Sequence, residues 1–251
     1  MAHVTWIGHG TVLVELDGAR LLTDPLLRDR VAHLRRYVPP PAADALRDLD
    51  AILITHLHRD HLDLPSLRTL AHDVPLIVPR GAGRMLLRRG YHAVREIAPG
   101  EEVAVGALTV TATEARHHGG RGTGGAHGPA LGYVIAGTRR VYQPGDTDLF
   151  DGMRTIGDGG LDLALVPIWG WGSRLGPGHL DPEGAARALA LLQPRKAVPI
   201  HWGTYSVGPA ARPPPAYLRA PLGRFLAAAG ELAPEVAVVP LEPGESLELD
   251  D

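Results

Sequence analysis

Short apolar runs separated by turn residues open the chain. Residues 2–7, 12–16 and 19–23 alternate apolar with polar positions or are apolar throughout, which is typical of β-strands with one or both faces buried. Asp17-Gly18 stands between the second and third runs and is a strong signal for a two-residue hairpin turn. The pattern therefore predicts an antiparallel meander at the start of the chain.

Further strands and helices follow in two batches. The helix at 182–192 has the clearest start signal, because Asp181 is a favourable N-cap and Pro182 stands at the first helical position. Gly90 and Gly230 mark the ends of two other predicted helices. The remaining strands are predicted at 51–54, 76–78, 103–105, 108–112, 131–135, 139–143, 161–166, 196–200 and 236–239, and the helices at 64–71, 82–89, about 148–156, 182–192 and 216–229.

This order of elements predicts an α/β fold. Strands in two batches, each followed by helices, favour two sheets packed face to face with helices on the outer faces. A chain of 251 residues with 45% hydrophobic content can bury one large core, and no linker separates the halves. We therefore predict a single domain over residues 1–251, with Pro- or Gly-rich loops at 39–41, 119–128 and 213–215.

Charge and composition narrow the function classes. The formal net charge is −3 and the arginines are scattered, so nothing supports binding to nucleic acid. No apolar stretch approaches the roughly 18 residues of a membrane span, and no signal-peptide pattern opens the chain, so we expect a cytoplasmic protein. The chain has no cysteine, so any metal must be held by His and Asp.

The candidate chemistry begins directly after the predicted strand 51–54. His56, His58, Asp60 and His61 follow in the pattern H-x-H-x-D-H. Imidazole and carboxylate together suit zinc, manganese or iron. A solvated polar loop needs no histidines at alternate positions, so we interpret the cluster as metal ligands.

Three further candidates each follow a predicted strand. His117 or His118 follows 108–112, Asp146 follows 139–143 in Gly-Asp-Thr, and His201 follows 196–200. Taken alone, each is more simply a cap or turn residue. Together with the upstream cluster, they predict ligand loops that meet at one sheet edge, where a rigid scaffold can bring distant residues together.

With these motifs the chain resembles the metallo-β-lactamase fold superfamily, and in particular the branch that holds the ascorbate-6-phosphate lactonases and the N-acylphosphatidylethanolamine-hydrolysing phospholipases D. The resemblance covers nearly the whole chain. Besides the ligand motifs, it rests on Ile7-Gly8-His9-Gly10-Thr11, Leu22-Thr23-Asp24-Pro25, Ile200-His201-Trp202-Gly203 and His179-Leu180-Asp181-Pro182-Glu183. It implies a four-layer αββα sandwich of two mixed sheets with a binuclear metal site.

Carried over residue by residue, the resemblance assigns the ligands. His56, His58 and His117 would hold one metal, Asp60, His61 and His201 the other, and Asp146 would bridge them; the Arg116-His117 alignment favours His117 over His118. Two divalent ions, most simply zinc with manganese or iron as alternatives, would activate a bridging hydroxide that attacks the substrate. Asp60 would also orient this hydroxide.

Other residues would act around the metals. Asp24 and His9 are expected to contact the ligands without binding metal. His179 would steady a leaving group or a developing oxyanion, although a plain helix-entry role is equally open.

The substrate side departs from the branch. Residues 123–129 lack the carboxylate and the aromatic ring that the branch usually has there. Trp169 and Trp171 could form an apolar wall beside the metals, with Arg174 reaching an anion, unless the indoles are simply core. We therefore expect a small-molecule substrate with anionic and apolar parts, and the oligomeric state is left open.

Two functions remain. The first is a binuclear metal-dependent hydrolase acting on a phosphodiester, a phosphorylated lactone or a related ester. The second is a non-hydrolytic redox or sensor protein that binds metal on the same scaffold. The set of five His and two Asp favours hydrolysis, because di-iron oxidoreductases carry more carboxylate ligands.

Overall fold

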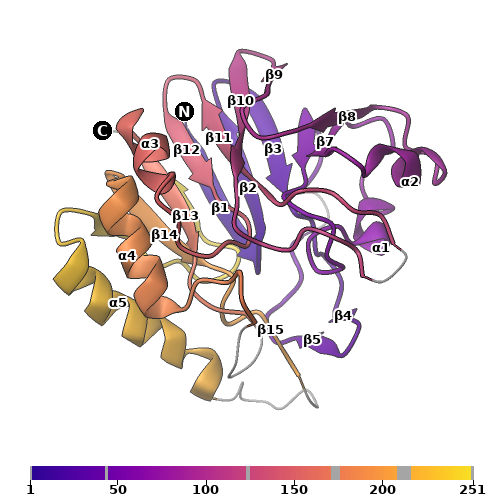
Figure 1. Ribbon diagram of the computed structural model, residues 1–251. Coiled ribbons are helices and arrows are strands. Elements are labelled where there is room, and N and C mark those ends of the chain that lie inside the picture. The colour runs from indigo at the N-terminus through magenta and orange to yellow at the C-terminus, as the bar shows by residue number, and fades with distance from the viewer. Residues whose placement is uncertain (1, 43–44, 123–124, 171–175, 208–215, 250–251) are drawn as a thin grey trace.

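Two seven-stranded sheets form the centre of the protein (Figure 1). The computed structural model describes residues 2–42, 45–122, 125–170, 176–207 and 216–249. The strand order is β17-β1-β2-β3-β6-β7-β8 in the first sheet and β16-β14-β13-β12-β11-β10-β9 in the second. Each sheet is mixed, because an antiparallel meander in each is extended by parallel strands.

The strands of the first sheet are β1 (His3–Gly8), β2 (Thr11–Leu16), β3 (Ala19–Thr23), β6 (Ala51–Leu53), β7 (Leu76–Pro79), β8 (Val94–Ile97) and β17 (Ser246–Glu248). Those of the second are β9 (Glu102–Val105), β10 (Leu108–Glu114), β11 (Leu131–Ala136), β12 (Arg140–Gln143), β13 (Leu163–Pro167), β14 (Lys196–Ile200) and β16 (Ala237–Val238). A small third sheet pairs β4 (Arg30–Val31), β5 (Leu34–Arg36) and β15 (Tyr205–Val207).

Helices cover the outer faces. On the first sheet lie α1 (Leu64–Leu67) and α2 (Gly83–Leu87), whose buried Leu67 and Leu86 pack with Ile52 and Leu76. On the second lie α3 (Met153–Asp158), α4 (Pro182–Leu192) and α5 (Ala220–Leu232), with the 3₁₀ turn η1 (Ala216–Leu218) before α5. The main apolar core draws on both sheets, so the predicted sandwich of two sheets between helices is confirmed.

The hairpin between β2 and β3 forms at the predicted place. Leu16 pairs with Ala19, and Asp17 and Gly18 have φ angles of 51° and 83°. Positive φ at both central residues is the backbone of the turn that matches strand twist in two-residue hairpins. The Asp17-Gly18 turn therefore sets the pairing of β2 with β3 in the first sheet.

Several predicted helices were too long. α1 ends at Leu67: the N–H of Arg68 still bonds Leu64 O, four residues back, but those of Thr69 and Leu70 bond only three residues back, in tight turns. The helix predicted from about 148 begins only at Met153, and α5 begins at Ala220 beside Pro221. α5 also runs past Gly230 to Leu232, since the tertiary contacts of its buried face outweigh one glycine.

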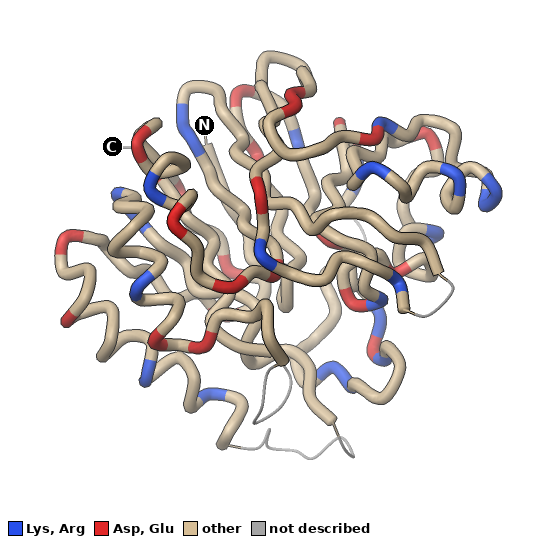
Figure 2. The backbone as a smooth tube through the Cα atoms, in the orientation of Figure 1, with Lys and Arg blue, Asp and Glu red and all other residues tan. Residues whose placement is uncertain are grey.

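Charged residues of both signs are interspersed over the chain (Figure 2). Among the described residues, no helix combines the length and the apolar character that a bilayer crossing requires.

The ligand motifs lie where strands of both sheets end. The loops after β6, β10, β12 and β14 carry the predicted ligands, and backbone hydrogen bonds join them to their neighbours. Leu131 N donates to Thr55 O, Asp148 N to Arg116 O and His201 N to His9 O. The sandwich thus brings loops from distant parts of the sequence to one place.

Candidate metal centre

The seven residues predicted as ligands come together at this edge. His56, His58 and His117 form one group, and Asp60, His61 and His201 form another together with His9; within each group the donor atoms lie within 4.8 Å of one another. These two groups share no residue, but a third group, His56, His61 and Asp146, takes a histidine from each, and a fourth joins His117 and Asp146 with His179. That these side chains bind metal stays a prediction, but their convergence is a property of the fold.

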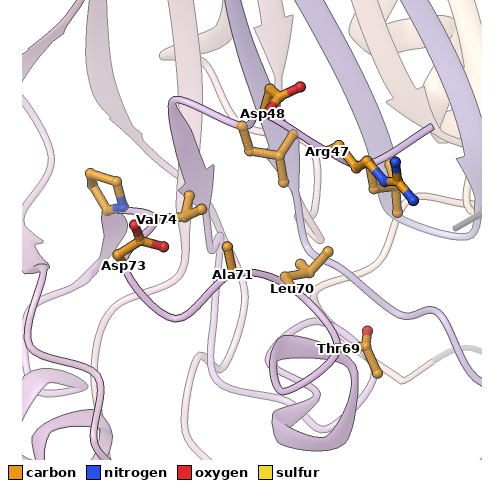
Figure 3. Close-up of a pocket in the computed structure, with 10 residues that line it drawn as sticks. Arg47, Asp48, Thr69, Leu70, Ala71, Asp73 and Val74 are labelled. Carbon is orange, nitrogen blue, oxygen red and sulfur yellow. The ribbon is translucent and has the colours of Figure 1, made fainter. Parts of the chain in front are cut away.

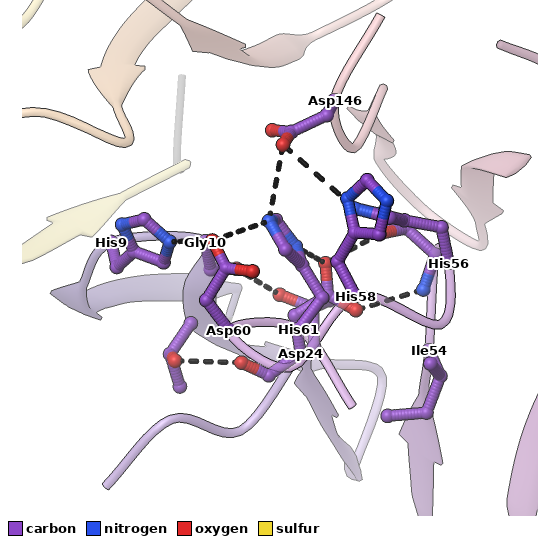
Figure 4. A network of polar contacts seen from close by, with 12 residues as sticks. His9, Gly10, Asp24, Ile54, His56, His58, Asp60, His61 and Asp146 are labelled. Atoms are coloured by element: carbon purple, nitrogen blue, oxygen red, sulfur yellow. Dashed lines mark hydrogen bonds and ion pairs between the residues drawn. The ribbon is translucent and has the colours of Figure 1, made fainter. Parts of the chain in front are cut away.

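Asp146 lies between the two groups (Figure 4). Its Oδ2 is 3.2 Å from His61 Nε2 and 3.9 Å from His56 Nε2, while its Oδ1 is 3.2 Å from His201 Nε2. Gly145 permits this approach, because a Cβ there would lie 2.6 Å from Thr55 Cβ and the residue has a φ of 63°. The carboxylate can therefore reach both groups.

Hydrogen bonds fix which ring nitrogens face the centre. His201 Nδ1 is 2.7 Å from Trp169 O, and His117 Nδ1 is 2.8 Å from Gly178 O. A carbonyl only accepts, so each Nδ1 carries the proton and donates it. The Nε2 of both rings then presents a lone pair to the centre, as a metal ligand must.

Asp24 and Thr55 orient the rings of His56 and His61. Thr55 donates its N–H to Asp24 Oδ1 at 2.8 Å and its hydroxyl to Asp24 Oδ2 at 2.6 Å. Because the hydroxyl proton is used, His56 Nδ1 donates to Thr55 Oγ1 at 3.1 Å, and His61 Nδ1 donates to Asp24 Oδ2 at 2.8 Å (Figure 4). Asp24 thus contacts the ligand shell from behind, as expected.

The resulting donor set fits a cation. His61 Nε2 and His201 Nε2, both facing Asp146, are 3.2 Å apart. His56 Nε2 is buried and has no hydrogen-bond partner among the described residues. His56 Nε2 and His201 Nε2 thus offer lone pairs beside the Asp146 carboxylate, and nitrogen and carboxylate donors together suit divalent ions.

Burial adjusts the protonation of these rings. It lowers the pKa of His117 to about 4 and that of His201 to about 3, and it holds the pKa of His56 well below its ordinary value. At His61 burial acts in the same direction, but the carboxylates of Asp146, Asp24 and Asp60 outweigh it and raise the pKa. Three rings are therefore neutral at pH 7, the form that binds metal, whereas His61 holds a proton that metal binding would have to displace.

His9 contacts a predicted ligand directly. Its Nε2 is 3.0 Å from Asp60 Oδ2, its ring centroid is 3.8 Å from that of His201, and its backbone N–H donates to Thr204 Oγ1. This placement agrees with a supporting role, although its ring nitrogen is also near enough to belong to the second donor group.

Backbone strain concentrates here. His9, Asp24 and His201 have φ angles of 55°, 39° and 64°, in the left-handed region that costs an ordinary residue about 1 kcal/mol or more. Such conformations persist where the surrounding structure imposes them; here they place the rings of His9 and His201 at the centre and the Asp24 carboxylate behind His61.

His179 lies on the open side of Asp146. Its Nε2 is 3.4 Å from Asp146 Oδ2, its Nδ1 is 3.1 Å from Gly176 O, and its ring centroid is 4.6 Å from that of His117. It also lines a cleft of about 480 Å³ with Asp148, Leu149, Trp169, Leu180, Asp181, Pro182, Gly184, Arg187 and Arg224. The residue that the sequence singled out therefore lies beside the predicted ligands.

The substrate-side predictions have a mixed outcome. Trp169 lines the cleft but is only 8% exposed and belongs to the main core, so it is both wall and packing residue. Trp171 and Arg174 lie outside the described residues. A second depression of about 500 Å³ at the start of β6 and β7 contains none of the predicted site residues (Figure 3).

The described part of the Gly-rich segment 119–128 makes close backbone contacts. A Cβ on Gly119 would lie 2.6 Å from Gly128 O, and one on Gly81 would lie 2.0 Å from His127 O. These glycines let backbone pack directly on backbone. His118, the alternative to His117, is exposed and is in none of the donor groups.

Thr55→Val tests the support of the ligand rings. The substitution keeps the side-chain volume but removes the hydroxyl that orients His56 and Asp24, so we expect Zn²⁺ affinity to fall about 10- to 100-fold. Competition with a chromogenic chelator measures it. Thr23→Val is the matched control: this buried hydroxyl donates to Gly10 O and accepts from Val12 N, and no hydrogen bond joins it to a predicted ligand among the described residues. Equal losses in both variants would contradict the prediction.

The comparisons with known proteins agree with this geometry. A family model described as the β-lactamase superfamily domain matches residues 19–202. An N-acyl-phosphatidylethanolamine-hydrolyzing phospholipase D of Caenorhabditis elegans is 36% identical over 230 residues, which cover 81% of this chain. The chain spans 64% of that relative's length.

Two further similarities extend over nearly the whole chain. A metal-dependent hydrolase of Methanopyrus kandleri is 33% identical over 252 residues, covering 98% of this chain and 99% of the relative. The structure of a metallo hydrolase from Ignicoccus hospitalis, 26% identical, superposes with a TM-score of 0.72 and covers 98% of this chain and 97% of its own. The chain therefore belongs to the metallo-β-lactamase superfamily, and its fold brings together a cluster of His and Asp side chains that could hold metal.

Proposed function

We propose that this protein is a hydrolase that uses two divalent metal ions to cleave a phosphodiester, a phosphorylated lactone or a related ester. One observation carries the proposal: two donor groups that share no residue lie next to Asp146, which forms a further donor group with His56 of the one and His61 of the other. A single tetrahedral ion needs only four ligands, whereas this cluster offers seven.

The residues divide naturally between two ions. His56, His58 and His117 would hold one, Asp60, His61 and His201 the other, and Asp146 would contact both. Nitrogen donors outnumber carboxylates, which favours zinc. When bound, two such ions lower the pKa of water and polarise the oxygen of the bond under attack.

Two side chains would orient the reaction. His9 holds one oxygen of Asp60 at 3.0 Å, which fixes the carboxylate that is to direct the attacking water. His179 is within 3.4 Å of Asp146, has 14% of its side chain exposed and borders the cleft, so it is the group best placed to give a proton to a departing oxygen or to stabilise a developing negative charge.

The cleft beside His179 supports a substrate with apolar and anionic parts. Leu149, Trp169 and Leu180 supply apolar surface, and the guanidinium of Arg187 supplies a positive charge. The name of the nematode relative, a phospholipase D, supports the phosphodiester class. A small molecule is the partner that such a cleft suits.

The test is a substrate screen with the full chain reconstituted with Zn²⁺, Mn²⁺ or Fe²⁺. Phosphodiesters with and without an apolar chain, a phosphorylated lactone, a phosphomonoester and a carboxyl ester are compared. We expect turnover of a phosphodiester or the lactone that a chelator abolishes and metal restores. Turnover of the monoester or the carboxyl ester alone would contradict the proposed substrate class, and oxygen consumption without hydrolysis would favour the redox alternative.

A further inference from the structure

We propose that Arg121 is a positioning residue that clamps the metal-ligand loop through its backbone. Its Nη1 donates to Leu62 O at 2.8 Å and lies 3.2 Å from Leu57 O. These two carbonyls bracket the loop that carries His58, Asp60 and His61. The two hydrogens on one guanidinium nitrogen can therefore tie the two ends of the loop together.

The described backbone hydrogen bonds within the loop 57–62 are few. Leu62 N and His61 N both donate to His58 O, at 2.8 and 3.2 Å, which closes a tight turn within the loop. Leu57 N donates to Gly119 O at 3.0 Å, so the start of the loop is also tied to the segment that carries Arg121. Arg121 and Gly119 thus connect the loop to one and the same neighbour.

The described part of that neighbour has backbone contacts of its own. Arg121 N donates to Ala126 O, Gly119 packs against the backbone of residues 128–130, and Leu131 at the start of β11 donates to Thr55 O just before the loop. Arg121 therefore belongs to the loop between β10 and β11 of the second sheet, while its guanidinium binds the loop that follows β6 of the first. It links the ligands supplied by the two sheets.

The contacts of Arg121 are to carbonyls rather than to an acid. Asp63, the nearest carboxylate in the ligand loop, binds Arg28 through both oxygens and also caps α1 through Ser66. Among the described residues, no ion pair joins Asp63 to Arg121. A guanidinium held by neutral carbonyls beside a cation site repels the ions, so charge alone would weaken metal binding.

The charge of Arg121 and its hydrogen bonds should therefore have opposite effects on the affinity for divalent ions. If Arg121 acts only through charge, its removal raises the affinity for divalent ions; if it positions the ligand loop, its removal lowers that affinity. The inference rests on the proposed metal site, but it concerns binding and not turnover.

The experiment compares Arg121→Met with Arg59→Met in the full chain. Arg59 is exposed on the same loop and donates no hydrogen bond to the described residues, so its removal takes away a similar charge without a clamp. Zn²⁺ alone is titrated against a chromogenic chelator, the visible spectrum of the Co²⁺-loaded protein reports coordination, and far-ultraviolet circular dichroism of the metal-free protein reports folding.

We expect Arg121→Met to weaken Zn²⁺ binding about 10-fold or more and to change the Co²⁺ spectrum, with the metal-free fold retained. Arg59→Met should leave the affinity unchanged or raise it. Wild-type or higher affinity in folded Arg121→Met overturns the inference, as does an equal loss in both variants. If Arg121→Met does not fold, Arg121→Gln, which can still donate to one carbonyl, takes its place under the same criteria. Failure of the wild-type protein to bind two ions would instead overturn the proposed function.

Discussion

Asp146→Ala should leave the folded protein with at most one tightly bound divalent ion and should lower turnover by about 10³-fold or more. Asp146 is the one carboxylate that contacts rings of both donor groups, at 3.2 Å from His61 and from His201 and 3.9 Å from His56. Without it, neither ion has its full set of ligands and nothing holds the pair together. Plasma mass spectrometry counts the ions, and single-turnover kinetics measures the chemistry.

Asp148→Asn is the matched control. Asp148 lies two residues further on, is exposed, and bonds only the adjacent Leu149 N among the described contacts of its side chain. We expect this variant to keep both ions. Two ions retained in Asp146→Ala, or the same loss in Asp148→Asn, would contradict the bridging role.

His58→Ala should abolish metal loading and hydrolysis together, whereas His179→Ala should leave both ions bound and reduce turnover about 10²-fold. His58 Nδ1 is 3.1 Å from His117 Nε2 inside the first donor group, so its loss leaves that ion with too few ligands. His179 faces Asp146 from the cleft side, where a proton donor or an oxyanion stabiliser acts on the substrate.

The test compares metal content and turnover between His58→Ala and His179→Ala. Metal content and single-turnover rates are determined on the same preparations. Equal metal loss in both variants would make His179 a ligand, and full turnover in His179→Ala would reduce it to a residue at the start of α4.

Much of the fold was predictable because its signals are local. α4 and β14 have the predicted bounds, since Asp181 caps the helix by accepting from Gly184 N and β14 is a short apolar strand with buried side chains. β8 and β17 were missed, because their charged or exposed residues give no apolar run. Their strand conformation comes from pairing with β7 and β1, which the sequence alone does not display.

For the candidate site too, some features could be predicted from the sequence and others depend on how the chain packs. The H-x-H-x-D-H motif and the candidate ligands at the ends of strands were predictable, since residue types and their spacing can be read directly from the sequence. The pairing of Asp24 with Thr55 and the clamp of Arg121 on Leu57 and Leu62 span 31 to 64 residues and depend on how the loops pack. If Trp171 lines the substrate site as the sequence suggests, Trp171→Ala should cost about 1 to 3 kcal/mol in kcat/KM for a substrate with an apolar group. Trp171 lies outside the described residues, so this stays a prediction.

The number of divalent ions in the wild-type protein decides whether the site is binuclear. Metal-free protein is reconstituted with excess Zn²⁺, passed through a desalting column and measured by plasma mass spectrometry against the protein concentration from quantitative amino-acid analysis. Two ions per chain are predicted, because two donor groups without a common residue meet at Asp146. A stoichiometry that stays at one ion or none under metal-replete conditions would contradict the binuclear mechanism.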